Sequence, residues 1–322
     1  MKVEGVFCIV CVAVGGLPGE APAQAYPVKP VRLIVPYAPG GGADAVARLI
    51  QPRFGDYLGQ QIVIDNRAGA GSNLGNELAA RAVPDGYTLL MGAAAMAINV
   101  TLYRSLAYDP VKDFTPVTLL ATSPNIVVVH PSLPVKSIKE LIALAQSAPG
   151  RINYASGGSG TTPHLASELF NVMAKIKLTH VPYKSAGPAL IALLSGEVPL
   201  SMLSPLAVLP HVNSGRLRAI AITSAARSDV LPQLPTVAES GLPGFEASQW
   251  YGVLTPAGTP AAAVTTLSSA LGKVLQTPEV RKRLLNEGSI PLGASQTEFG
   301  DYLKSEISKW GNVVRYSGAR VD

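Results

Sequence analysis

Cysteine is almost missing from this sequence of 322 residues, in which only Cys8 and Cys11 are present. Both lie in a segment, residues 1–25, that we expect to be removed, so the mature chain would contain no cysteine. Such a chain has no disulfide, no thiol nucleophile and no cysteine ligand for a metal ion. Charged residues are also few, at 15%, and the net charge of +5 is spread without a basic run. This charge pattern argues against nucleic acid as a partner.

Motifs for catalysis and cofactor binding are missing as well. The four histidines show no H-E-x-x-H spacing, so we predict no metal site. Residues 157–161 come closest to G-x-S-x-G but lack the final glycine, and no Gly-Lys-Ser/Thr follows the glycines at 40–42. Those glycines partly match the dinucleotide fingerprint, with Asp65 further along, but nicotinamide cofactors are scarce outside the cytoplasm. We therefore predict no cofactor and no catalytic residues.

The first 25 residues have the features of a secretory signal peptide. The start at residues 1–2 is weakly basic, residues 6–14 are apolar, and residues 23–25 fit an A-x-A cleavage site. Glu4 does not fit this pattern, but the apolar run is too short to span a bilayer. Neither cysteine follows the small residue that is usual at a lipoprotein cleavage site. We therefore expect an exported, soluble chain that begins at Tyr26.

Short apolar runs alternate with helical patterns over most of the chain. Residues 31–35, 61–66 and 87–92 are predicted strands, and the apolar residues within 46–58 recur at helical spacing. This order predicts parallel strand pairs with helices on the sheet faces, and ligands in such sheets bind beyond the carboxyl ends of the strands. A second unit of the same kind follows, with predicted strands at 125–130, 152–156, 177–181, 198–203 and 218–223. The predicted fold class is therefore α/β.

Two glycine-rich turns open helices in different parts of the chain. The glycines at 40–42 follow the strand at 31–35, and residues 157–164 follow a strand of the second unit. In the second turn we predict Thr162 as the N-cap and Pro163 as the first helical residue. The first N–H groups of a helix have no partner within it, and the helix dipole favours an anion there. We predict that both turns face one carboxylate, although a tight strand-to-helix turn also explains the glycines on steric grounds.

The order of the elements predicts two lobes joined by two crossings. A predicted strand at 248–255 is followed by helices, the last of which begins with a capping box of Ser295 and Glu298. We expect these C-terminal helices to return to the first lobe, with crossings near 122–126 and 246–250. The predicted lobes are residues 26–124 with 249–322, and residues 125–248. Such an arrangement makes a hinged clamp.

Several polar and aromatic residues have two explanations each. Asp44 either complements the start of its helix or hydrogen-bonds a protonated group or a water in the site. His164 fits a pocket or surface position better than a catalytic base. Tyr183 and Lys184 either add a ring and a cation to the cleft or lie in a solvated turn. Trp250 fits packing in the core or at the hinge.

Four motifs give the chain a close resemblance to a known family. They are PYAPGGGAD at 36–44, DNRAGAGSNLG at 65–75, TTPHLA within 157–168, and THVPYK at 179–184. With these motifs the chain resembles the Bug family, the TctC-like extracytoplasmic solute receptors of tripartite tricarboxylate transporters. The resemblance covers essentially all of the mature chain. It implies a two-lobed periplasmic-binding-protein (Venus-flytrap) fold, in which each lobe is a mostly parallel sheet flanked by helices.

The resemblance also implies a function and a place in the cell. The chain would be a periplasmic receptor, not an enzyme, that closes on a small organic carboxylate. It would deliver this solute to integral-membrane transporter subunits in transient contacts, and we expect it to be a monomer. Two other functions stay open. A sensor that feeds a membrane signalling protein would differ only in its docking surface, and an exported α/β enzyme would carry a nucleophile or base in the cleft.

The family also indicates where the solute binds. In relatives, the loops that match residues 37–44 and 156–162 hold a carboxylate, partly through ordered waters. Residues 199–204 lack the acidic side chains that many relatives have there, so we expect a solute without a positive charge, such as a di- or tricarboxylate or an aromatic acid. No metal ion and no cofactor are expected in the site. The residues that we expect to bind the solute are Tyr37, Gly41, Gly42, Asp44, Ala94, Ser156, Gly160, Thr161, Thr162 and Ser204.

Overall fold

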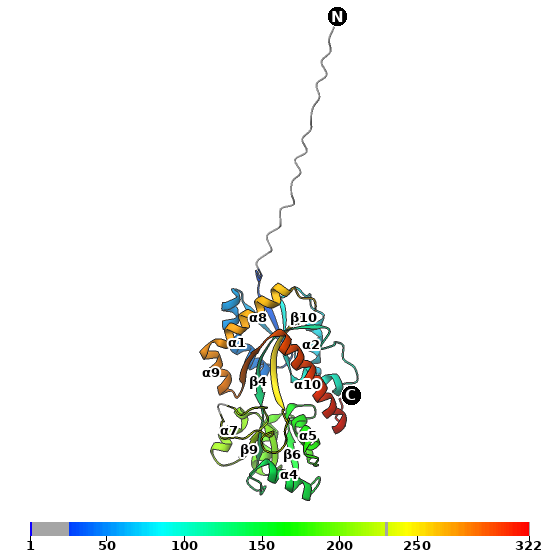
Figure 1. Cartoon of the computed structure of the whole chain (residues 1–322), viewed down its shortest axis with the longest axis vertical. Coiled ribbons are helices and arrows are strands. Elements are labelled where there is room, and N and C mark those ends of the chain that lie inside the picture. Colours follow the sequence, from blue (N-terminus) through cyan, green and yellow to red (C-terminus); the bar gives the residue numbers. More distant parts are fainter. Residues whose placement is uncertain (2–25, 229–230, 322) are drawn as a thin grey trace.

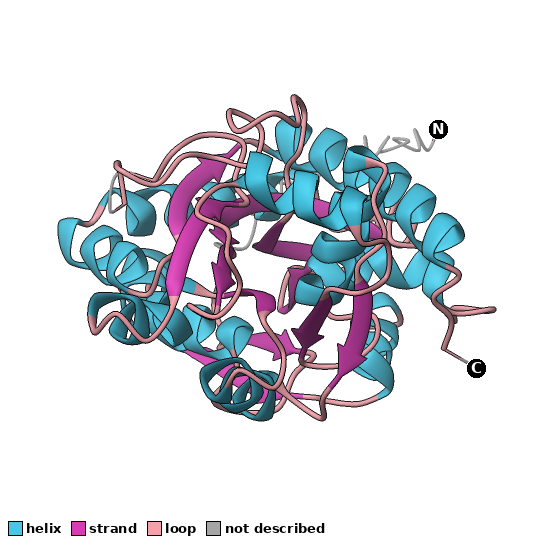
Figure 2. Cartoon of the chain, turned by 90° about the horizontal axis from the view of Figure 1, so that it is seen from below, coloured by secondary structure: helices cyan, strands magenta, loops and turns pink. Residues whose placement is uncertain are grey.

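The chain folds into two α/β lobes, each built on one sheet. The computed structural model describes residue 1, residues 26–228 and residues 231–321. The first sheet has the strand order β11-β4-β10-β3-β1-β2, and the second has the order β7-β6-β8-β5-β9. Figure 1 shows the first lobe above the second, and Figure 2 shows helices packed outside the strands. The predicted signal peptide lies, apart from residue 1, outside the described residues.

The first sheet has helices on both faces. Helices α1, α8 and α9 pack together over one face, and α10 packs with α3 and β4 over the other. The strands are β1 (Val31–Val35), β2 (Ile62–Asn66), β3 (Thr88–Ala93), β4 (Phe114–Pro124), β10 (Ser248–Pro256) and β11 (Ile290–Ala294). The helices are α1 (Gly42–Leu58), η1 (Ala70–Ser72), α2 (Asn73–Ala80), α3 (Ala94–Leu102), α8 (Ala261–Gln276), α9 (Pro278–Asn286) and α10 (Gln296–Ser317).

The second lobe is smaller and lies between β4 and β10 in the sequence. Its strands are β5 (Ile126–Val129), β6 (Asn153–Ser156), β7 (Thr179–Pro182), β8 (Leu200–Leu203) and β9 (Arg218–Ile222). Its helices are α4 (Ile138–Ser147), α5 (Thr162–Ala174), α6 (Ala186–Ser195) and α7 (Pro205–Asn213). In neither lobe does the described part of the chain include a helix long and apolar enough to cross a membrane.

The two-lobed α/β fold agrees with the prediction, with one correction, because both sheets are mixed rather than mostly parallel. Strands β1, β2 and β3 pair in parallel, as do β6, β7 and β8. The antiparallel pairs involve the strands that carry the crossings: β10 pairs with β3 and β4, β11 pairs with β4, and β5 pairs with β8 and β9. One crossing leaves the first lobe and the other returns, so β4 and β10 lie side by side in opposite directions.

Hydrogen bonds hold the two crossings together. The first crossing passes through Asn125, between β4 and β5, and the second passes through Ala247, just before β10; Thr223, directly after β9, contacts both. The Asn125 N–H donates to Thr223 Oγ1 at 2.8 Å, and the Thr223 N–H donates to the Asn125 carbonyl at 2.9 Å. Thr223 Oγ1 in turn donates to the Ala247 carbonyl at 2.7 Å. Residue 125 is therefore fixed where the lobes meet.

Helix α10 anchors the returning strand β10 to the first lobe. The fully buried ring of Trp250 contacts the rings of Phe299 and Tyr302 edge-on, with centroids 5.7 Å and 6.2 Å apart. The predicted capping box of Ser295 and Glu298 is present at the start of this helix. Trp250 is thus a core residue, and α10 packs on α3 and β4.

Candidate ligand-binding site

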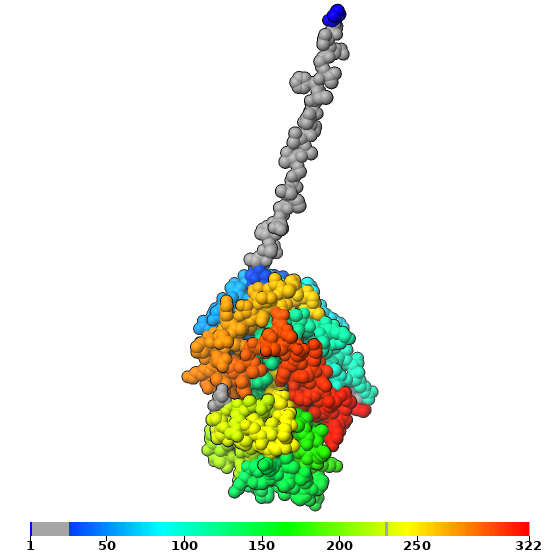
Figure 3. Space-filling model, in the orientation of Figure 1, coloured from blue at the N-terminus to red at the C-terminus, as the bar shows by residue number. Residues whose placement is uncertain are grey.

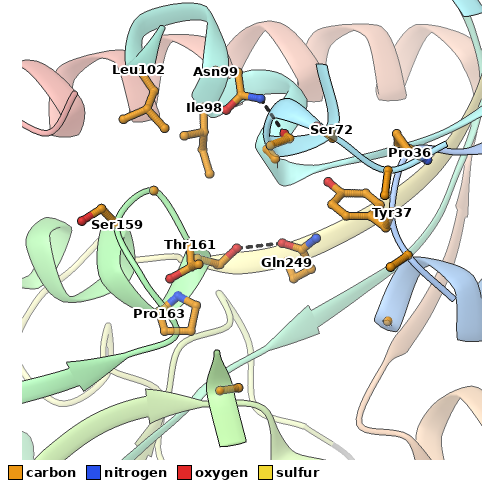
Figure 4. Close-up of a pocket in the computed structure, with 18 of the residues that line it drawn as sticks. Pro36, Tyr37, Ser72, Ile98, Asn99, Leu102, Ser159, Thr161, Pro163 and Gln249 are labelled. Carbon is orange, nitrogen blue, oxygen red and sulfur yellow. Dashed lines mark hydrogen bonds between the residues drawn. The ribbon is translucent and has the colours of Figure 1, made fainter. Parts of the chain in front are cut away.

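A cavity of about 630 Å³ lies between the two lobes and is lined by residues from both. In Figure 4, Ile98 and Leu102 approach it from α3, Tyr37 from the loop after β1, and Ser159 and Thr161 from the loop before α5. Figure 3 shows the green and yellow surface of the second lobe directly against the first. The segments at the crossings add Ser123, Asn125, Gln249 and Tyr251 to the lining.

Within the described residues, six helices begin at this cavity, three from each lobe. Each of them follows one of the parallel strands, so their N-termini gather at the carboxyl ends of those strands. The lining residues at these helix starts are Gly42 of α1, Ser72 of α2, Ala95 of α3, Thr161 and Thr162 of α5, Ala186 of α6 and Ser204 of α7. The start of a helix carries roughly half a positive charge, although at α2 the N–H groups of Ser72, Asn73 and Leu74 already donate to the carbonyls of Gly69 and Ala70. The cavity therefore attracts anions without a basic side chain.

The lining, as far as the structure describes it, contains no carboxylate and no basic side chain. Among the described residues around the cavity there is no Asp, Glu, Lys, Arg or His. An anion would thus be bound by N–H and hydroxyl donors that are already in place, which offsets the loss of its hydration. An ammonium group would have no carboxylate to pair with. The described part of the chain also holds no group of three His, Cys, Asp or Glu residues that could bind a metal ion.

Glycine at position 42 is required by a tyrosine on the crossing strand. A Cβ atom at Gly42 would lie 2.2 Å from the hydroxyl oxygen of Tyr251, so any side chain there would displace the ring. Burial raises the pKa of Tyr251, and it raises the pKa of the nearby Tyr37 to about 12. Both phenols therefore stay protonated at neutral pH and both line the cavity. They add O–H donors beside the start of α1.

Asp44 supports the glycine turn and does not line the cavity. Its buried carboxylate accepts hydrogen bonds from the Gly40 N–H at 2.9 Å, from Arg48 Nε at 2.9 Å and from Asn66 Nδ2 at 2.9 Å. Burial alone would raise the pKa of Asp44, but the hydrogen bonds from Arg48, Gly40 and Asn66 outweigh it and lower the pKa. Of the two explanations for Asp44, these contacts favour a role in holding the turn.

The turn before α5 begins its helix one residue earlier than predicted. Thr161 is the N-cap, and Thr162 and Pro163 are the first two helical residues. Thr161 makes no capping hydrogen bond with its side chain, and the hydroxyls of both threonines donate to other groups. Thr161 Oγ1 donates to the Gly158 carbonyl at 2.7 Å, which closes the turn. Thr162 Oγ1 donates to Gln249 Oε1 at 2.7 Å, which joins the second lobe to the returning crossing strand.

Two stacked histidines lie beneath this turn. The rings of His164 and His180 are 4.1 Å apart, and His180 stacks in turn on Tyr154. His164 Nδ1 accepts a hydrogen bond from the Gly160 N–H at 3.0 Å, and His180 Nε2 lies 2.6 Å from Ser156 Oγ. Burial lowers the pKa of both histidines to about 4, so they are neutral at pH 7. Neither ring lines the cavity, so His164 is a support for the turn rather than a base.

The family of the chain is decided by comparison with known proteins. The family model described as the tripartite tricarboxylate transporter family receptor matches residues 46–319. The chain belongs to this receptor family. Protein BugT of Bordetella pertussis is 36% identical to it over 323 residues, which cover 100% of the chain and 98% of BugT. The predicted family is therefore confirmed, and with it the role of a solute receptor for a tricarboxylate-type transporter.

Solved structures of relatives share the fold. The R. palustris protein Rpa4515, solved with adipate, is 37% identical with a TM-score of 0.78, and the match covers 91% of this receptor and 98% of that chain. MatC (Rpa3494) from Rhodopseudomonas palustris, solved with bound malate, is 36% identical with a TM-score of 0.74, over 90% of this receptor and 100% of that chain.

The structure brings together six of the ten residues predicted to bind the solute. Those that line the cavity of this receptor are Tyr37, Gly42, Gly160, Thr161, Thr162 and Ser204. Gly41, Asp44, Ala94 and Ser156 do not line it. Gly41 is the N-cap of α1, and Asp44 faces its turn. Ala94 and Ser156 are fully buried.

Other lining residues were not predicted. Ser72 ends η1 and is the N-cap of α2, Asn99 lies on α3, and the others, at the crossings, are Ser123, Asn125, Gln249 and Tyr251. The glycine-rich segment at 65–75 and the predicted crossings were signals for most of them, but they did not indicate which side chain turns inward. Tyr183 is not in the lining, and its hydroxyl donates to Glu197 Oε1 at 2.9 Å on the surface. Lys184 does not line the cavity either.

Proposed function

We propose that this receptor captures a small carboxylate-bearing solute between its lobes and delivers it to the membrane subunits of its transporter. The observation that supports this most directly is the convergence of six helix N-termini on a cavity whose described lining has no charged side chain. Such a site favours an anion through dipoles and prearranged donors. The adipate and malate bound by two relatives are solutes of this class.

We further propose the division of labour between the lobes. Residues 26–124 with 249–322 form one lobe and residues 125–248 the other, each supplying three helix starts. A carboxylate first accepts hydrogen bonds from donors of one lobe. When the lobes close, donors of the other lobe supply its remaining hydrogen bonds, so the closed form binds it more tightly than the open form. Closure would in turn present the docking surface for the transporter. We place the receptor in the periplasm, as a monomer without enzymatic activity.

Capture of carboxylates is tested with matched acids and neutral analogues. The purified receptor is titrated with adipate, malate, citrate and benzoate by calorimetry, and its melting temperature is measured with each compound. At a hundredfold excess over Kd, binding adds about 2.7 kcal/mol of stability and should raise the melting temperature by about 5 °C. Adipamide, which lacks the charges of adipate, and 1,6-diaminohexane are the controls. Binding of either control without binding of any acid would contradict the proposal.

Closure of the lobes is tested at Gly160. A Cβ atom there would lie 2.6 Å from Leu102 Cδ2 on α3, so Gly160→Ala places a methyl group between the lobes. Overpacking of about 1–3 kcal/mol would oppose closure, and we expect the affinity for the acids to fall about 5- to 150-fold in calorimetric titrations.

The control for this substitution is Gly244→Ala. Gly244 has a φ of +81°, close to the +80° of Gly160, but a Cβ atom there would have no neighbour within 4 Å. Both variants therefore carry the same backbone strain in the left-handed region, and only Gly160→Ala meets the opposite lobe. Equal losses of affinity in the two variants would refute the role of this contact in closure.

A further inference from the structure

Asn125 combines deep burial with an unused hydrogen-bond donor at the cavity. Its side chain is on the first crossing, only 6% of the residue is exposed, and it lines the cavity. Its backbone N–H and carbonyl are both paired with Thr223. Its side-chain Nδ2, however, has no hydrogen-bond partner among the described residues. The backbone of Asn125 thus holds the crossing, while its Nδ2 has no partner among the described residues.

A buried donor without a partner is destabilising by about 1–3 kcal/mol, so each one calls for an explanation. Within the described residues, four buried side-chain atoms are of this kind: Asn76 Oδ1, Asn125 Nδ2, Trp250 Nε1 and Tyr302 Oη. Of these four residues, only Asn125 borders the cavity. We therefore look for the hydrogen-bond acceptor of Asn125 Nδ2 in the solute that the cavity binds.

We propose that Asn125 Nδ2 donates a hydrogen bond to a carboxylate oxygen of the bound solute. This donor would favour solutes that place a hydrogen-bond acceptor at the end of the cavity beside the two crossings. This inference rests on the proposed function and names a further contact of that site. A carboxylate accepts several hydrogen bonds, and those from neutral N–H donors to a charged oxygen are among the stronger ones. The solute, rather than a side chain, completes the hydrogen bonding of Asn125.

The test separates binding from stability with Asn125→Leu, in which leucine has the same branched shape and no donor. Loss of one hydrogen bond to a charged oxygen corresponds to about 1.5–3 kcal/mol, so the affinity for adipate, malate or benzoate should fall about 10- to 150-fold in calorimetric titrations. The unliganded variant should melt at or above the wild-type temperature, because no bond within the protein is lost and an unpaired buried donor is removed. Asn125→Asp, which repels a carboxylate, should weaken binding further.

Asn171→Leu is the control, and its expected effects on affinity and stability are the opposite of those of Asn125→Leu. Asn171 is also buried, on α5, but its amide oxygen accepts from the Leu178 N–H at 2.9 Å and it does not line the cavity. Its replacement should lower the melting temperature and leave the affinity for the acids unchanged. The two variants therefore predict opposite patterns in the same two measurements.

Three results would overturn the inference. If wild-type receptor binds an acid and Asn125→Leu binds it equally well, Asn125 is not a contact, although the proposed function stands. If Asn125→Leu melts as low as Asn171→Leu before any acid is added, the amide has a partner within the protein. If wild type binds none of adipate, malate, citrate and benzoate, the proposed function fails and takes this contact with it.

Discussion

A Thr161→Asp receptor should no longer bind carboxylates at concentrations that saturate the wild type. Thr161 lines the cavity at the start of α5, where the helix dipole and free N–H groups favour a negative charge. A fixed carboxylate there would occupy that position itself. At a separation of about 5 Å and an effective dielectric constant of about 20, it would also repel the solute by about 3 kcal/mol. The expected loss of affinity is more than a hundredfold.

The design of this variant separates charge from folding. Asp is among the preferred N-cap residues and stabilises a helix start, so α5 should survive. Asp does lose the hydrogen bond from Thr161 Oγ1 to the Gly158 carbonyl, which is 2.7 Å long. Thr161→Asn is the matched control, since its amide can still donate there and it carries no charge. We expect Asn to bind the acids within about fivefold of wild type; an Asp variant that binds as tightly as Asn would remove α5 from the site.

Much of the fold was predictable because its signals are local. The run at 31–35 corresponds to β1, which is buried on both faces and therefore apolar at every position but Arg32, and the helical spacing at 46–58 corresponds to α1, whose apolar residues share one face. Strand β4 was missed, because Pro116 and several polar residues interrupt its pattern. Helix α3 was missed for the opposite reason. It is buried between the sheet and α10, and its apolar residues therefore show no periodicity.

The site was predictable only in part, because it depends on pairing over long distances. Glycines at 40–42 and a Thr-Pro pair at 162–163 indicate two helix starts, and both are at the cavity. The convergence of four more helix starts follows from the order of the parallel strands, which no local pattern reveals. In addition, which side chains at the crossings point into the cavity depends on the pairing of β10 with β3 and β4. This pairing also makes the first sheet mixed.

Acid should destabilise this receptor well above the pH at which most carboxylates titrate. His164 is only 5% exposed, stacks on His180, and uses Nδ1 to accept from the Gly160 N–H. Burial, with a smaller contribution from repulsion by the neighbouring His180, lowers the pKa of His164 from 6.5 to about 4. A protonated Nδ1 could no longer accept from Gly160. Protonation therefore opposes both the stacking and the turn before α5.

The direction of the effect follows from proton uptake. In the unfolded chain His164 titrates near 6.5, and in the folded chain near 4, so between these values the unfolded chain binds more protons. The contribution of His164 to the free energy of unfolding is fully present above about pH 6.5 and is lost as the pH falls toward 4. Below about pH 4 this contribution does not change further. The loss is on the order of 3 kcal/mol for His164. His180, whose pKa burial also lowers to about 4, adds a smaller share because its ring is partly exposed.

Two variants isolate this contribution from the other titrating groups. His164→Asn keeps an acceptor near Gly160, and His180→Gln keeps a partner for Ser156, but neither new side chain binds a proton. We expect the free energy of unfolding in urea to fall more steeply between pH 6.5 and 4.5 for wild type than for His164→Asn. The difference should be largest for His164→Asn, since that ring is the more deeply buried. If the plots of unfolding free energy against pH are parallel for wild type and both variants, folding does not lower the pKa of either histidine. The stacked pair would then not stabilise the turn before α5 through its neutral form.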